Sequence, residues 1–66
     1  MRTKQQMAEQ ASELAETFVN GNRAEVRGAL VCCATNVDAA TLSTLILIYL
    51  TPDERVSFRN WIVSLG

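Results

Sequence analysis

The charged residues of this chain are gathered at its two ends. Of the 13 charged side chains in 66 residues, eight lie within residues 1–27 and four within residues 53–66. The 25 residues from 28 to 52 carry a single charge, on Asp38. The apolar residues, which make up 48% of the chain, are therefore concentrated in its middle.

A first helix is predicted over residues 4–19. Thr3 and Gln6 have the spacing of a capping box, in which each side chain bonds the backbone N–H of the other residue. Asn20 and Gly21 tolerate the left-handed backbone at which helices end. One face of this helix is apolar and carries Met7, Ala11, Leu14 and Phe18, whereas another is acidic and carries Glu9, Glu13 and Glu16.

A second helix is predicted over residues 23–34, with Asn22 as its cap and Glu25 as the box partner. Gly28 costs about 1 kcal/mol relative to alanine inside a helix, and close approach of another helix is one reason to tolerate it. That neighbour is either another part of the chain or a second copy. One stripe of this helix carries Val26, Leu30 and Cys33, and the opposite side carries Ala24, Gly28, Val31, Cys32 and Thr35. A helix that is apolar on two sides packs between neighbours.

A third helix is predicted over residues 39–50, capped by Asp38, with Asn36 as the rival cap. It is the most apolar helix, and we expect it to be central and buried. Its polar side chains can hide their hydroxyls by bonding a carbonyl one turn back. These side chains are Thr41, Ser43 and Thr44.

A fourth helix is predicted over residues 52–64. Thr51 is its cap, Pro52 suits the first helical position, and Glu54 completes a capping box. Its apolar face carries Phe58, Trp61, Ile62 and Leu65.

The predicted fold is all-α: one domain, a compact bundle of four short helices. Short connections favour antiparallel neighbours. A chain this small buries only about 60% of the surface that its unfolded form exposes, so its stability alone is marginal. The second and third helices also have more apolar surface than two short amphipathic helices can cover. We therefore expect a homodimer to complete the bundle.

The composition offers no basis for catalysis, a metal or a cofactor. The chain has no histidine, so it lacks the usual base near neutral pH and the usual partner of a serine or cysteine nucleophile. Its two cysteines, Cys32 and Cys33, are adjacent and cannot supply the four ligands of a zinc site from one chain, although a two-fold dimer could pool four thiolates. Its three glycines are isolated and form no phosphate-binding loop. We expect no enzyme activity, with Cys33 packed in the core and Cys32 at an interface.

Charge and hydropathy also bear on location and partners. The longest uncharged apolar run has 12 residues, 39–50, whereas a membrane span needs about 20. The polar N-terminus lacks the apolar region of a signal peptide, which favours the cytoplasm. The net charge of −1 gives no surplus of basic residues for phosphates, so neither a membrane nor nucleic acid is the expected partner.

The leading functional hypothesis is a small, non-enzymatic protein-interaction module that acts as a regulator, inhibitor or adaptor, as a homodimer. The alternative is a dimeric helix-turn-helix-like DNA-binding regulator that uses Arg23, Arg27, Arg2 and Lys4. The predicted dimer interface comprises Ala24, Gly28, Val31, Cys32, Leu47 and Ile48. The predicted partner-binding residues are Glu9, Glu13, Glu16, Arg55, Arg59 and Trp61. The identity of the bound protein is not encoded in any motif of the chain.

Overall fold

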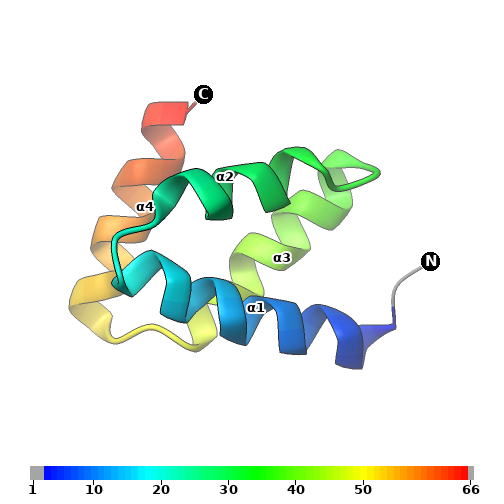
Figure 1. Ribbon diagram of the computed structural model, residues 1–66, viewed down its shortest axis with the longest axis horizontal. Coiled ribbons are helices and arrows are strands. Elements are labelled where there is room, and N and C mark those ends of the chain that lie inside the picture. The colour runs from blue at the N-terminus through cyan, green and yellow to red at the C-terminus, as the bar shows by residue number, and fades with distance from the viewer. Residues whose placement is uncertain (1–2, 66) are drawn as a thin grey trace.

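The computed structural model describes residues 3–65, and these residues form helices and no strand. The helices are α1 (Lys4–Val19), α2 (Arg23–Val31), α3 (Asn36–Ile48) and α4 (Pro52–Leu65). In Figure 1, α1 and α2 run in opposite directions, and α4 stands at the side where their connecting loop lies. α3 slants from the far end of α2 toward α1. The expectation of an all-helical, compact four-helix unit is confirmed.

Two capping boxes begin α1 and α4 at the predicted residues. The Thr3 hydroxyl accepts from the Gln6 backbone N–H at 3.1 Å, and the Gln6 side chain accepts from the Thr3 N–H at 3.0 Å. At α4, the Thr51 hydroxyl accepts from the Glu54 N–H at 3.3 Å, while the Thr51 N–H donates to the Glu54 carboxylate at 2.8 Å. These bonds satisfy donors that a helix start leaves without a helical partner.

The boundary between α2 and α3 differs from the sequence prediction. α2 ends at Val31 rather than at residue 34, and Cys32 is its C-cap. Thr35 has extended backbone, with φ −139° and ψ 162°, and its hydroxyl accepts from the Asp38 N–H at 3.1 Å. Thr35 is therefore the cap of α3, and neither Asp38 nor Asn36 has that role. The chain has to leave the helical conformation before residue 35, which shortens α2.

The end of α3 also lies earlier than predicted. The helix ends at Ile48, with Tyr49 as its C-cap, instead of continuing to Leu50. The proline ring at position 52 disfavours helical backbone at Thr51, so the chain straightens before α4 begins. Leu50 lies outside the helix, yet it is only 4% exposed and packs in the core.

The core draws on all four helices but leaves one side of α3 uncovered. In α3, Leu42 and Ile46 are fully buried, whereas Ile48 is 62% exposed. The helix expected to be central and buried is therefore buried on one side within the chain, and Ile48, a predicted dimer-interface residue, lies on its uncovered side. The exposed hydroxyls of α3 are satisfied as expected, since Thr41 donates to the Val37 carbonyl at 2.9 Å. The buried residues are Ala11, Leu14, Ala15, Phe18, Val26, Leu42, Ile46, Leu50 and Phe58.

Three aromatic rings join α4 to the end of α1. The Phe18 and Phe58 rings meet edge to face, with centroids 5.1 Å apart. The Trp61 ring is tilted against both, at 5.5 Å from Phe18 and 5.7 Å from Phe58. Aromatic pairs in such arrangements add about 0.5–1.5 kcal/mol to the gain from burial. This cluster fixes the position of α4 and hence of the surface that α4 shares with α3.

Candidate functional site

Several large apolar side chains stay exposed after folding. Val63 and Val31 are the most exposed, at 78% and 74%. The others are Val19, Val37, Ile48, Tyr49, Val56 and Leu65. Single exposed apolar residues are ordinary, but groups of them mark binding surfaces. The grouping of these residues therefore decides where a site can lie.

An apolar groove runs between α3 and α4. One part encloses about 280 Å³, and a neighbouring hollow encloses about 300 Å³. Leu47 and Arg59 line both, so the two form one continuous surface, called here the α3–α4 groove. The residues of the groove are Ser43, Thr44, Leu47, Ile48, Arg55, Phe58, Arg59, Ile62 and Val63. No acidic residue is among them.

Two arginines supply the charge of the α3–α4 groove. The Arg55 Nε donates to the Leu47 carbonyl oxygen at 2.7 Å, which places a cation at the end of α3, where the helix dipole favours positive charge. Arg59 forms no hydrogen bond or ion pair with another residue of the range 3–65. Its guanidinium has five donors and is exposed beside apolar side chains. The rim of the groove is therefore positive and available to an anion.

An acidic hollow of about 470 Å³ lies where α1 meets the end of α3. Glu9 and Glu13, both exposed, line it together with Tyr49, which is 49% exposed. Gln5, Ala8 and Ser12 complete the lining. Glu16 is exposed on the same helix but does not line the acidic hollow. Since Tyr49 directly follows Ile48 in the chain, the acidic hollow and the α3–α4 groove lie close together.

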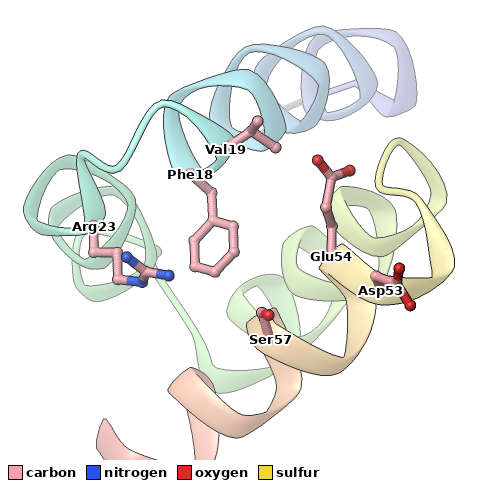
Figure 2. A pocket seen from close by; sticks show the side chains of 6 residues that line it. All are labelled: Phe18, Val19, Arg23, Asp53, Glu54 and Ser57. Carbon is pink, nitrogen blue, oxygen red and sulfur yellow. The ribbon is translucent and has the colours of Figure 1, made fainter.

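A third, polar pocket of about 220 Å³ lies between the end of α1 and the start of α4. The Arg23 guanidinium lies over the Phe18 ring, 4.6 Å from its centroid. Figure 2 shows Arg23 on one side of that ring, with Glu54 and Asp53 on the other. A phosphate approaching Arg23 would therefore meet two carboxylates as well.

The predicted basic residues of a DNA-binding surface are spread over the molecule. Arg27 is exposed on α2 and Lys4 is exposed in the first turn of α1. Arg2 lies outside the described residues. Arg23 stacks on the Phe18 ring and shares its pocket with the carboxylates of Asp53 and Glu54.

The exposed side of α2 is a separate surface. Ala24, Gly28, Val31 and Cys32 are all exposed and are called here the α2 face. A Cβ built on Gly28 would meet nothing within 4 Å, so no part of the chain packs closely on this glycine. A closely packed helix of the same chain therefore does not explain the glycine at position 28. The remaining prediction is that another molecule contacts this position.

The structure divides the predicted dimer interface. Leu47 and Ile48 line a groove with α4 residues, whereas the other four members lie on the α2 face. The predicted partner-binding residues Arg55 and Arg59 share that groove with Leu47 and Ile48. Trp61 packs in the aromatic cluster and is only partly exposed.

Sequence reasoning missed several contributors to these surfaces. Ile62 and Val63 line the α3–α4 groove, and Tyr49 lines the acidic hollow. One available signal was the spacing of Val56, Arg59 and Val63, which puts them on one stripe of α4 opposite Phe58. That stripe has to face outward once Phe58 points into the core.

Within residues 3–65, no three side chains of the kinds that bind metals lie close enough to hold an ion. No helix in the same range is both long and apolar enough to cross a membrane.

The cysteines differ in exposure: Cys32 is exposed at the end of α2, whereas Cys33 is partly buried, with its Sγ 3.5 Å from the Ala29 carbonyl oxygen.

No family model, curated protein or solved structure matches this chain. Function therefore has to be inferred from the chemistry of the surfaces just described.

Proposed function

We propose that this chain is a non-enzymatic protein-interaction module, a homodimer that acts as a regulator, inhibitor or adaptor by binding another protein. The supporting observation is that exposed apolar side chains gather on two separate surfaces, the α3–α4 groove and the α2 face. One of these surfaces is covered by the second copy and the other by the bound protein. Apolar contacts combined with arginine and aromatic side chains are typical of the energetic centres of interfaces.

The small size of the core supports the dimer. Below about 70–80 residues a single core rarely provides more than about 3–5 kcal/mol. The helices leave Val31 and Ile48 more than half exposed, at 74% and 62%. Covering these side chains with a second copy would stabilise the protein by about 25 cal/mol for every Å² of apolar surface removed from water. Association therefore adds stability that the isolated chain lacks.

Two matched substitutions test the proposal. Val31 and Ile48 are the last residues of α2 and α3, where a lysine suits the helix dipole and disturbs no core contact. Val19→Lys is the control, because Val19 is the last residue of α1 and is 53% exposed. The readouts are sedimentation equilibrium for the dimer and affinity capture from the native host, after nuclease treatment and in high salt, for the bound protein.

We expect one of Val31→Lys and Ile48→Lys to abolish the dimer and the other to abolish capture, with Val19→Lys changing neither. If the native chain is a monomer and captures no protein, the proposal is wrong. If duplex DNA is retained at physiological salt and lost in high salt, the chain is a DNA-binding regulator instead, since counterion release makes that affinity steeply salt-dependent.

A further inference from the structure

We propose that the surface around the C-terminal end of α3 is the two-fold interface of the dimer. In this interface Glu9 and Glu13 of each copy face Arg55 and Arg59 of the other. The inference rests on the proposed function, because it names the surface through which the module binds a second copy of itself.

The centre of this interface is apolar. Ile48 and Tyr49 are consecutive residues with exposed fractions of 62% and 49%. Ile48 lines the α3–α4 groove and Tyr49 lines the acidic hollow. The two residues therefore separate a positive surface from a negative one. An interface of this composition has an apolar centre and a charged rim.

Opposite charges around an apolar centre make a surface complementary to itself. In a two-fold interface the same surface is used by both copies, so that residue i of one meets residue j of the other, and j meets i. Rotation by 180° about the apolar centre brings the acidic hollow of each copy onto the arginines of its partner. A surface with one sign of charge on both sides would repel its own copy.

The spacing of the charged residues supports this pairing. Glu9 and Glu13 are four residues apart on α1, and Arg55 and Arg59 are four residues apart on α4. Each pair therefore spans about 6 Å along its helix, at about 1.5 Å per residue. Two rows with the same span allow each carboxylate to meet one guanidinium.

The arginines are prepared for such contacts. Within residues 3–65, Arg55 is engaged through its Nε alone, by the Leu47 carbonyl at 2.7 Å, which leaves its terminal N–H groups for a carboxylate. Arg59 has no partner among residues 3–65. A guanidinium can bind a carboxylate through two parallel hydrogen bonds, which fixes orientation as well as adding energy.

The second copy fits this surface better than other anionic partners. DNA or an acidic lipid would be attracted by Arg55 and Arg59, but would be repelled by Glu9 and Glu13 close by. An acidic peptide could use the arginines and would leave the acidic hollow without a partner. Only a partner that carries both signs of charge uses the whole surface, and a second copy of this chain has both in the required order.

The first test compares two charge reversals that change the net charge equally. Arg59→Glu lies in the proposed interface and Arg27→Glu lies on α2, and both arginines are exposed. We expect Arg59→Glu to raise the dimer dissociation constant about tenfold, because each reversal changes two symmetric contacts. Arg27→Glu should leave it within about twofold, since Arg27 lies on α2 and lines neither the α3–α4 groove nor the acidic hollow. Sedimentation equilibrium measures both, and circular dichroism verifies that the variants are folded.

The second test restores the interface from two damaged copies. Arg55→Glu with Arg59→Glu makes both sides of the apolar centre acidic, and Glu9→Lys with Glu13→Lys makes both sides basic. Each double variant alone should be monomeric at concentrations where the native chain is dimeric. Their equimolar mixture should sediment as a heterodimer, because every contact then joins opposite charges.

Three outcomes overturn the inference. If Arg27→Glu weakens the dimer as much as Arg59→Glu, net charge and not this surface controls association. If the dimer survives all the charge reversals and dissociates on Val31→Lys, the α2 face is the interface. In that second case the inference fails while the proposed function stands, whereas a native chain that neither dimerises nor binds a protein defeats both.

Discussion

Arg55 in the first turn of α4 donates its Nε hydrogen to the carbonyl oxygen of Leu47, near the end of α3, at 2.7 Å. The same carbonyl accepts from the Leu50 backbone N–H at 3.2 Å, so the Arg55 side chain is a second donor to it. It also joins α4 to α3, the two walls of the α3–α4 groove. One exposed contact thus connects the ending of a helix to the shape of a candidate binding surface.

Replacing Arg55 with methionine should lower the free energy of unfolding by about 1 kcal/mol, the net value of such a hydrogen bond. Methionine keeps most of the apolar stem, so the loss reports the bond and not the packing. Urea unfolding at protein concentrations that favour the monomer measures the change. Arg59→Met is the matched control and should change the free energy by less than about 0.5 kcal/mol, because Arg59 has no such bond within residues 3–65. Equal losses in the two variants would show that the Leu47 contact does not stabilise the fold.

The two internal glycines should respond in opposite ways to alanine. Gly28 lies in α2, and the added methyl group of alanine would meet nothing within 4 Å, so Gly28→Ala should stabilise the monomer by about 0.5–1 kcal/mol. Gly21 has φ +93°, a conformation that strains other residues, so Gly21→Ala should destabilise it by about 1 kcal/mol or more. Thermal and urea unfolding measure both. A loss of stability in Gly28→Ala would mean that another part of the chain packs on this position.

Removal of the central aromatic ring should unfold the chain. Phe58 is 1% exposed and contacts the rings of Phe18 and Trp61. Phe→Ala in a core costs about 3–5 kcal/mol, which equals the whole stability expected of a core this small. Circular dichroism should show loss of helix, and Trp61 fluorescence should shift to longer wavelength as its ring enters water. Val63→Ala removes a side chain that is 78% exposed and should leave both signals unchanged.

The two adjacent thiols should react at different rates. Cys32 is exposed, whereas Cys33 is partly buried with its Sγ 3.5 Å from the Ala29 carbonyl oxygen. A thiol reagent under native conditions should therefore modify Cys32 first, and mass spectrometry of the partly labelled chain identifies the site. The single variants Cys32→Ser and Cys33→Ser provide the reference rates. Equal, rapid labelling of both would contradict the position of Cys33 against the core.

The helices could be predicted from local rules because those rules act within a few residues. The boxes Thr3–Gln6 and Thr51–Glu54 are contacts over three residues, and both are formed as expected. The sequence predicts that α2 ends at residue 34, whereas it ends at Val31. The prediction is too long because it counts Thr35 among the small residues on one side of α2, and Thr35 is instead the cap of α3. A threonine followed three residues later by an acidic residue identifies the start of α4, and Thr35 and Asp38 have the same spacing. Applied to this pair, the spacing places the start of α3 correctly.

The candidate site was less predictable, because it depends on how helices meet. The sequence assigns Ile48 to the dimer interface, and the structure leaves this side chain exposed. No local pattern could show that Ile48 would lie beside Arg55 and Arg59, since that contact is set by the turn between α3 and α4 and by the aromatic cluster. Tyr49, the C-cap of α3, likewise lines the acidic hollow together with Glu9 only because α1 meets the end of α3.

The revised cap of α3 can be tested directly. Thr35→Ala should lower the free energy of unfolding by about 1 kcal/mol, because the Asp38 N–H loses its acceptor at 3.1 Å. Thr35→Ser keeps the hydroxyl and should retain most of the stability. Asn36→Ala should have little effect, since Asn36 is the first residue of the helix and alanine is a better helix former. If Asn36→Ala costs as much as Thr35→Ala in urea unfolding, then Asn36, the rival cap in the sequence, and not Thr35 caps α3.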